Sequence, residues 1–208
     1  RRQAMIAIVD YGLGNVSAFA NIYKSLNIPH QIANRPEVMA EATKIILPGV
    51  GAFDHAIQQL NDSGMREGLD KAVLQEGTPV LGICVGMQML ARSSEEGTLP
   101  GLGWIDGVVK KLDPANLTHR PHLPHMGWNN VLATQQNDLL KNLDNKPVFY
   151  FLHSFFFSCA DSSDVIAETD YGGTFACAVN AKNVYGIQCH PEKSHRNGIQ
   201  LLENFARI

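Results

Sequence analysis

Apolar runs alternate with amphipathic stretches in the first part of the chain. Residues 5–9 form a short apolar run that predicts a buried parallel strand, and residues 29–33 and 44–47 are further short strand candidates. Residues 15–27, 52–61 and 65–75 predict helices. In the first two of these, apolar side chains recur three and four positions apart and would share one face: Phe19, Ile22, Tyr23 and Leu26, then Phe53, Ala56, Ile57 and Leu60. The alternation predicts an α/β fold with right-handed crossovers and a largely parallel central sheet flanked by helices.

After Gly97 the pattern changes to short strand-like runs broken by glycine, asparagine and proline. These runs cover residues 105–112, 128–133, 148–153, 165–169, 175–179 and 184–188. They predict a β-rich second half, mixed or antiparallel, followed by a C-terminal helix that packs through Ile199, Leu202 and Phe205. No repeat or linker separates the halves, so we expect a single domain over residues 5–208. We interpret residues 1–4 as a tag remnant or an altered start before Met5.

Composition excludes several classes of protein. The 208 residues, 45% of them hydrophobic, are enough for a sizeable core. A net charge of −3 gives no long-range attraction for nucleic-acid phosphates. The early apolar run is too short for a signal peptide or a membrane span. The four cysteines show no CxxC spacing, which favours reduced thiols in the cytoplasm over a zinc site or disulfides: Cys84, Cys159, Cys177 and Cys189.

The segment PVLGICVGMQ at residues 79–88 is the strongest candidate for chemistry. An apolar run enters the turn Gly82-Ile83-Cys84-Val85-Gly86 and then an amphipathic helix, the pattern of a nucleophile elbow with cysteine in place of serine. At a helix N-terminus, unpaired amides and the helix dipole favour the thiolate, which is the reactive form of cysteine. The alternative reading is a buried, inert cysteine between two packing glycines.

A base and a carboxylate for Cys84 are present in His190-Pro191-Glu192, directly after a strand-like run. Histidine can take and return a proton, and a carboxylate fixes its tautomer and stabilises the imidazolium. Proline ends the strand, so that Glu192 can fold back onto His190. The tripeptide alone is also typical of a surface turn. Together with the elbow, it predicts a Cys-His-Glu triad.

The sequence around both motifs resembles the class I, triad-type glutamine amidotransferases. Six further stretches resemble those glutaminase subunits of the family that pair with a (βα)8-barrel synthase. In order, they are DYGLGN at residues 10–15, LPGVGAF at 47–53, SEEG at 94–97, PHMGWN at 124–129, HSF at 153–155 and PEKS at 191–194. The resemblance covers almost the whole chain.

This resemblance implies a flavodoxin-like, class I amidotransferase fold and a glutaminase. Cys84, His190 and Glu192 would hydrolyse glutamine to glutamate and ammonia through a cysteine thioester. The resemblance also implies a heterodimer, in which a (βα)8-barrel synthase subunit receives the ammonia through a shielded channel. That subunit would make imidazole glycerol phosphate and aminoimidazole carboxamide ribotide in histidine biosynthesis. No cofactor or metal is expected.

The resemblance extends to residues around the triad. Two backbone amides are needed for an oxyanion hole, and the candidates are Val85 and the loop Gly49-Val50-Gly51, where one peptide would reorient for activity. The resemblance implies that Gln88, Glu96 and the segment His153-Ser154-Phe155 bind substrate. Glu96 would hold the ammonium end of glutamine, and Phe155 replaces a tyrosine. The barrel partner would contact Asn15, Trp128 and Lys193. Solvated side chains remain the alternative for Gln88, Glu96 and Lys193.

Three other features carry less weight. The stretch from Gly12 through Gly14 to Ser17 lacks the third glycine of a dinucleotide-binding loop. The histidines in HRPHLPH at residues 119–125 recur every third position, but prolines prevent a helix that would gather them around a metal. Cys189 lies beside His190 but has no elbow around it.

Two alternative functions stay open from the sequence. The same glutaminase could supply another ammonia-accepting synthase, for example one for surface-sugar amidination. A non-enzymatic binding or stress protein could also carry the elbow cysteine, and in that case His190 and Glu192 need not lie near Cys84.

Overall fold

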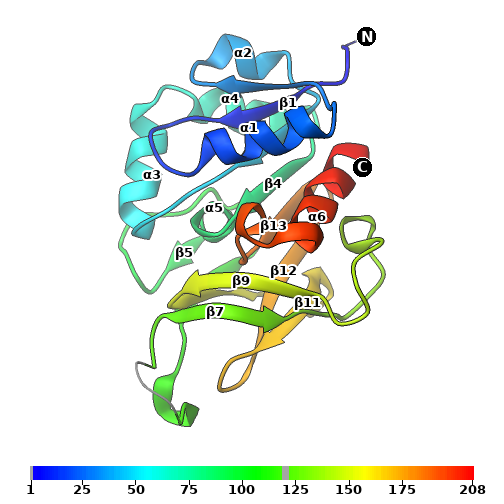
Figure 1. Cartoon of the computed structure of the whole chain (residues 1–208). Helices are drawn as coiled ribbons and strands as arrows, with labels where there is room; N and C mark the ends of the chain where they lie inside the picture. The colour runs from blue at the N-terminus through cyan, green and yellow to red at the C-terminus, as the bar shows by residue number, and fades with distance from the viewer. Residues whose placement is uncertain (1, 119–121) are drawn as a thin grey trace.

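Five parallel strands form the first part of the main sheet. In the computed structural model, which describes residues 2–118 and 122–208, this sheet has the strand order β2-β1-β3-β4-β13-β12-β11-β8 (Figure 1). The parallel strands are β1 (Ile6–Val9), β2 (His30–Ala33), β3 (Lys44–Leu47), β4 (Val80–Ile83) and β13 (Val184–Ile187). Every residue of β1 and β4 is buried, because helices cover both faces of these strands.

Antiparallel strands from the second half extend the same sheet. β12 (Thr174–Ala181) pairs with β13, β11 (Val165–Asp170) with β12, and β8 (Leu132–Ala133) with β11. Both halves therefore contribute to one sheet and to one connected cluster of buried apolar side chains. The predicted α/β fold with a mixed, largely parallel sheet is confirmed.

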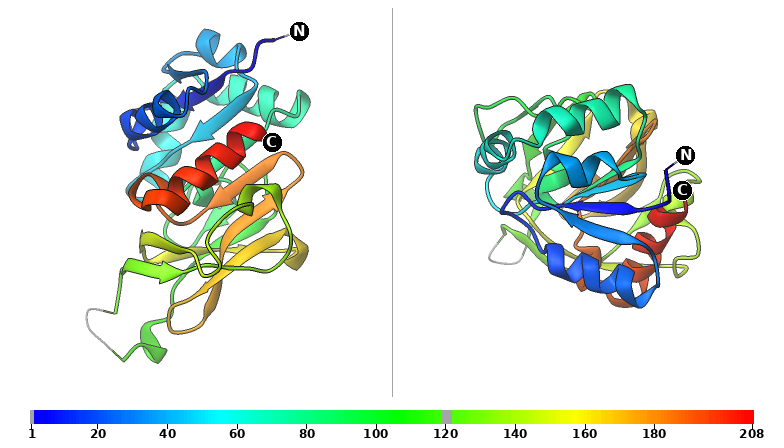
Figure 2. Two further views of the ribbon diagram at one scale, coloured as in Figure 1. Left: turned by 45° about the vertical axis from the view of Figure 1, so that its right-hand side comes forward. Right: turned by 90° about the horizontal axis from the view of Figure 1, so that it is seen from above.

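Helices lie on both sides of the main sheet (Figure 2). α1 (Val16–Ser25) and α6 (His195–Arg207) cover one face, while α3 (Phe53–Asp62) and α4 (Arg66–Asp70) cover the other. α2 (Pro36–Ala40) lies near the edge strand β2. The four apolar residues predicted for the buried face of α3 are all buried. Among the described residues, no helix combines the length and apolar character needed to cross a membrane.

Two smaller sheets lie beside the main one. β6 (Gly107–Lys111) pairs with β10 (Phe155–Cys159) and with the two-residue strand β5 (Ser93–Ser94). β7 (His125–Asn130) and β9 (Val148–His153) form an antiparallel ribbon. Four short 3-10 helices complete the secondary structure of the described residues: Pro114–Asn116, Asp138–Leu140, Ser162–Asp164 and Pro191–Lys193.

The structure corrects four details of the sequence-based prediction. The run at residues 128–133 divides between β7 and β8, which belong to different sheets. The helix at 65–75 is α4 followed by a π-helix, Lys71–Gln75. Ile199 is 38% exposed, and Leu201 takes its expected place in the core. The helix after the elbow, α5 (Val85–Gln88), is one buried turn rather than an amphipathic helix, because other segments cover it on all sides.

Candidate active site

The ends of two adjacent strands bring Cys84 next to the histidine motif. Ile83 of β4 pairs with Ile187 of β13, and the Cys84 N–H donates a hydrogen bond of 2.9 Å to the Ile187 carbonyl. Cys84 itself has φ 58° and ψ −115°, a strained conformation at the start of α5. This is the geometry of a nucleophile elbow, which exposes the corner side chain at the carboxyl end of the sheet.

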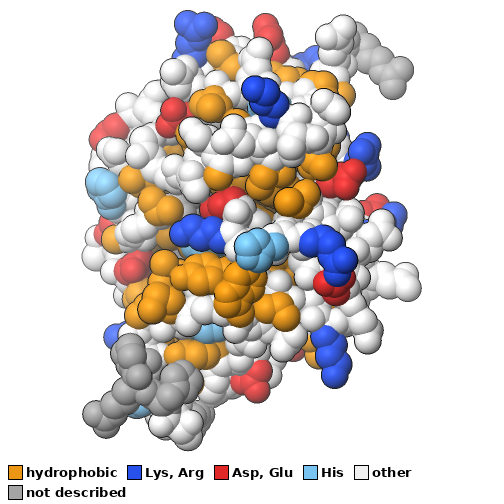
Figure 3. Space-filling view, in the orientation of Figure 1, with side chains coloured by type: hydrophobic (Ala, Val, Ile, Leu, Met, Phe, Trp, Pro, Cys, Tyr) orange, Lys and Arg blue, Asp and Glu red, His pale blue; other side chains and the backbone are white. Residues whose placement is uncertain are grey.

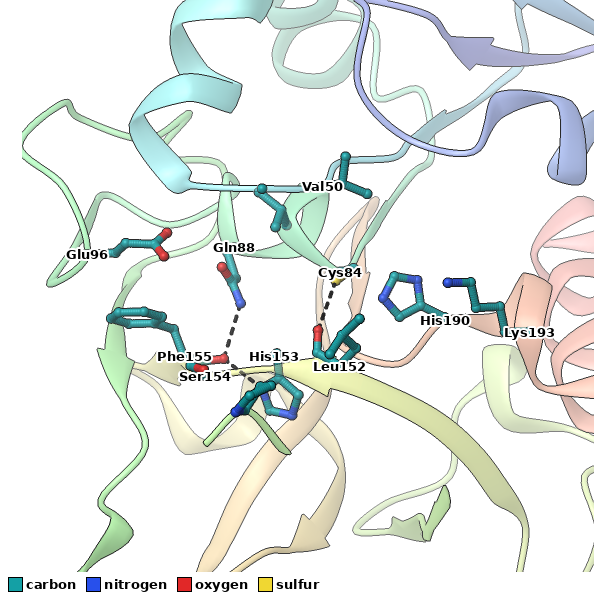
Figure 4. A pocket seen from close by; sticks show the side chains of 13 residues that line it. Val50, Cys84, Gln88, Glu96, Leu152, His153, Ser154, Phe155, His190 and Lys193 are labelled. Carbon is teal, nitrogen blue, oxygen red and sulfur yellow. Dashed lines mark hydrogen bonds between the residues drawn. The ribbon is translucent and has the colours of Figure 1, made fainter. Parts of the chain in front are cut away.

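His190 and Glu192 complete a buried triad with Cys84. The His190 N–H donates a hydrogen bond of 2.9 Å to the Tyr150 carbonyl, which fixes the histidine backbone against β9. Its Nδ1 lies 3.4 Å from each Glu192 carboxylate oxygen, within the 3-10 turn that follows the strand, and the Glu192 side chain is only 3% exposed. In Figure 4 the imidazole faces the sulfur of Cys84. The predicted triad residues therefore converge.

The electrostatics of His190 suit an ion pair with the sulfur. Burial lowers the pKa of His190, but its hydrogen bonds with Cys84 and Glu192 outweigh burial and raise the pKa to about 10. The imidazolium therefore persists at neutral pH. A cation beside the sulfur favours the thiolate, which is the nucleophilic form. Burial is the main cause that raises the pKa values of the other three thiols: that of Cys159 to about 12, and those of Cys177 and Cys189 well above the ordinary range.

The loop between β3 and α3 packs directly on the elbow. A Cβ on Gly49 would lie 2.6 Å from the Gly86 nitrogen, so only glycine allows the two backbones to approach so closely. Val50 and Gly51 reach the cavity over Cys84, as does Val85 at the start of α5. Gly49 itself does not line the cavity. Both predicted oxyanion segments thus lie beside the nucleophile.

A cavity of about 380 Å³ opens over Cys84. Its lining includes all five residues predicted to bind substrate: Gln88, Glu96, His153, Ser154 and Phe155. Gln88 is buried, whereas Glu96 is exposed but accepts a backbone hydrogen bond. The Gln88 Nε2 donates a hydrogen bond of 3.1 Å to the Phe155 carbonyl, and Glu96 Oε1 accepts one of 2.7 Å from the Phe53 N–H. Leu152 and Pro124 also line the cavity, although the sequence analysis assigned no role to either side chain.

A glutamine amidotransferase class-I family model matches residues 7–208. The chain belongs to the class-I glutamine amidotransferase family. Similar curated members include the imidazole glycerol phosphate synthase subunit HisH of Bdellovibrio bacteriovorus, 56% identical over 98% of this chain and 100% of the relative. The protein of the same name from Leptospira borgpetersenii is 52% identical over the same shares. The family resemblance and the enzyme class predicted from the motifs are confirmed.

Solved structures with low sequence identity share the fold. A glutamine amidotransferase aligns with a TM-score of 0.72 and 18% identity, over 97% of this chain and 99% of that one. PurLQS from Thermotoga maritima aligns with a TM-score of 0.72 and 16% identity, over 99% of this chain and 98% of that one. At this level of identity the alignments support the fold, whereas the family assignment rests on the family model and the curated relatives.

Sequence reasoning about this amidotransferase missed two polar residues at the site. The Tyr11 hydroxyl donates a hydrogen bond of 2.6 Å to the carbonyl of Pro48, the residue before the candidate oxyanion loop. Burial, and to a smaller degree the neighbouring Cys84, raises the pKa of Tyr11, so the hydroxyl stays a donor. Gln188 is fully buried; its Oε1 accepts from Gln88 at 3.1 Å, and its Nε2 lies 3.9 Å from the Cys84 sulfur. Tyr11 belongs to the quoted motif at residues 10–15 and Gln188 ends the strand-like run at 184–188, but only the fold shows what they contact.

The three residues predicted to contact a partner lie at the surface of this amidotransferase. Asn15 is exposed before α1. Trp128 is 51% exposed and stacks on His195, with ring centroids 5.3 Å apart. Lys193 lines the cavity entrance, and its Nζ lies 5.8 Å from the Tyr150 ring centroid.

Within residues 2–118 and 122–208, no three histidine, cysteine or acidic side chains are arranged to hold a metal ion. Of the histidine repeat, His119 lies outside the described residues and His125 is buried. His122 offers its carbonyl to the Tyr171 hydroxyl.

Proposed function

We propose that this chain hydrolyses glutamine to glutamate and ammonia through a thioester on Cys84. One observation carries this proposal: Cys84, His190 and Glu192 converge at a cavity that is also lined by Gln88 and Glu96. A buried non-catalytic cysteine would require neither a charged histidine beside it nor a cavity above it. The convergence therefore argues against the alternative of a binding or stress protein.

The reaction follows from the protonation states at the site. The Cys84 thiolate attacks the side-chain amide carbon of glutamine, and backbone amides of Val85 and the Gly49-Val50-Gly51 loop stabilise the oxyanion. The His190 imidazolium gives its proton to the amide nitrogen, so that ammonia leaves and a glutamyl thioester remains. Neutral His190 then takes a proton from water, which attacks the thioester. Glutamate is released and the thiolate and imidazolium are restored.

The fate of the ammonia points to a partner protein. Most free ammonia at neutral pH is protonated and not nucleophilic, so a shielded route to an acceptor is an advantage. The outer face of the β7–β9 ribbon carries exposed apolar side chains beside the cavity (Figure 3): Met126, Trp128, Val148 and Leu152. Exposed apolar clusters of this kind are typical of protein interfaces.

The names of the curated relatives support the partner that we propose. They are subunits of imidazole glycerol phosphate synthase. The chain would accordingly form a heterodimer with a (βα)8-barrel subunit, to which it channels ammonia for imidazole glycerol phosphate and aminoimidazole carboxamide ribotide in histidine biosynthesis. The reduced, unpaired thiols are consistent with a cytoplasmic location.

A glutamine-analogue electrophile tests the chemistry directly. Treatment of the chain, followed by peptide mass mapping, should place the adduct on Cys84 and on none of the other three cysteines. Cys84→Ala should abolish labelling and, in the presence of the barrel partner with its nucleotide ligand, glutamate release. The circular dichroism spectrum of the Cys84→Ala variant should match that of the unmodified protein. An adduct on Cys159 or Cys189 would refute the assignment.

A further inference from the structure

Two buried histidines outside the triad form a direct pair across the β7–β9 ribbon. His125 and His153 are register partners, and His125 Nδ1 lies 2.9 Å from His153 Nε2. The two residues are 3% and 6% exposed. His125 also stacks between the rings of Phe151 and Tyr171, with centroids 4.9 and 4.1 Å away. The triad mechanism uses neither imidazole ring.

Neighbouring groups fix the direction of every hydrogen bond in this pair. Asn129 Oδ1 accepts the Asn130 N–H at 2.8 Å, so its Nδ2 must face the other two partners. That nitrogen lies 2.8 Å from the Asp170 carbonyl, which can only accept, and 3.2 Å from His125 Nε2. His125 Nε2 is therefore an acceptor, and the ring proton of neutral His125 is on Nδ1.

The donor and acceptor roles of the His153 ring nitrogens follow in the same way. The His125 Nδ1–H donates to His153 Nε2, so neutral His153 also has its proton on Nδ1. The His153 Nδ1–H in turn donates a hydrogen bond of 2.8 Å to the Phe155 carbonyl. Both rings stay neutral: burial lowers the pKa of His125 to about 4 and, together with the neighbouring His125 and His190, that of His153 to about 3.

We call this row of hydrogen bonds, from Asn129 through His125 and His153, the relay. The Phe155 carbonyl connects the relay to the active site. It also accepts the Gln88 Nε2 at 3.1 Å, and Figure 4 shows the bonds from Gln88 and His153 reaching it from opposite sides. Because a carbonyl cannot donate, the Gln88 amide nitrogen must point toward it. The Gln88 oxygen is thereby turned away from Phe155, and the same nitrogen also donates to Gln188 Oε1.

From this geometry we infer that His125 is a positioning residue for glutamine binding. Acting through His153, it sets the Phe155 carbonyl that orients the Gln88 amide in the cavity. This inference rests on the proposed glutaminase function. A purely structural His125 would need to fill its ring-lined space but would not need a particular tautomer.

The tautomers can be measured without any assay of activity. Long-range ¹H–¹⁵N correlation spectra of the histidine rings at neutral pH should show the Nδ1–H tautomer for both His125 and His153. In solution, free histidine prefers the other tautomer, so this signature reports the relay itself. An Nε2–H tautomer at either ring would overturn the inference.

Substitutions then test the effect on binding. His125→Phe keeps an aromatic ring for stacking but leaves His153 Nε2 without its donor. It should raise the analogue concentration for half-maximal Cys84 labelling roughly tenfold, equivalent to about 1.4 kcal/mol, while the maximal labelling rate changes less. His125→Asn retains an N–H near the Nδ1 position and should recover most of the affinity. Equal half-maximal concentrations for His125→Phe and the unmodified chain would overturn the inference.

A second pair of variants covers the case in which His125→Phe does not fold. Asn129→Asp has the same shape but presents no donor to His125 Nε2. We expect it to remove the Nδ1–H signature of neutral His125 and to weaken analogue binding. Asn130→Asp adds the same charge one residue away and should leave both unchanged. If the unmodified chain is not labelled even in the presence of the barrel partner and its nucleotide ligand, the proposed glutaminase fails, and the ring spectra still decide whether the relay exists.

Discussion

The Tyr11 hydroxyl donates a hydrogen bond of 2.6 Å to the Pro48 carbonyl, immediately before the loop that carries the candidate oxyanion donors. This contact ties the loop after β3 to the segment after β1. The loop also rests on the elbow through Gly49 and Gly86. One end of a segment proposed to reorient is therefore anchored beside the nucleophile.

Tyr11→Phe should lower the partner-stimulated rate of glutamate release. Without the hydroxyl, the Pro48 carbonyl loses its donor and the oxyanion amides are less well positioned, so we expect kcat to fall roughly tenfold with little change in KM. Steady-state glutamate release in the presence of the barrel partner is the measurement. Tyr23→Phe is a matched control, because it removes an equivalent buried bond, to the Leu202 carbonyl at 2.9 Å, far from the site. Equal kcat losses in both variants would contradict a specific role for Tyr11.

Glu192→Gln should reduce turnover far more than it reduces glutamine affinity. The amide keeps the size of the carboxylate, but it removes the charge that helps to raise the pKa of His190 and can present an N–H to Nδ1. We expect kcat to fall by at least about 100-fold, with KM changing only a few-fold. Paired kinetic measurements at saturating partner would check this, and an unchanged kcat would leave Glu192 as a residue of the turn only.

The isolated chain should be nearly inactive as a glutaminase. Val50 lies between two glycines and is 41% exposed at the cavity, which favours a peptide reorientation that leaves Cys84, His190 and Glu192 in place. Binding of the barrel partner with its nucleotide ligand would favour the conformer that directs an amide at the oxyanion. A 100-fold gain in rate requires only about 2.7 kcal/mol of differential binding.

Glutamate release should be compared for the chain alone, with the partner, and with partner plus ligand. Trp128→Ala provides the control: it should weaken stimulation by the partner while leaving the labelling of Cys84 in the isolated chain unchanged. Equal rates in all three conditions would exclude the switch and favour a free-standing hydrolase.

The sequence predicted those parts of the fold and site that depend on local pattern. The strand before Cys84, the buried face of α3 and the histidine motif each lie within a short segment, so periodicity and motif spacing were sufficient. The four-residue helix α5 was misjudged because its burial depends on segments distant in sequence. Ile199 has helical spacing with Leu202, but the orientation of α6 on the sheet exposes it.

Polar contacts between distant segments could not be predicted in the same way. Nothing in the sequence indicated a role for Tyr11 or Gln188, because their partners Pro48 and Gln88 lie far along the chain. His125 stood in the histidine repeat and in the motif at residues 124–129, but neither pattern indicated a contact for its ring. Its actual partner, His153, became apparent from the register of two strands.

The position of β13 between β4 and β12 has a consequence for the synthesis of this protein. The nucleophile leaves the ribosome well before its base, and the strand that delivers the base is inserted into the interior of the sheet rather than added at an edge. A nascent or C-terminally truncated chain therefore has Cys84 but no imidazole to activate it. The proposed triad can therefore assemble only after residues 184–192 have been synthesised and β13 has entered the sheet.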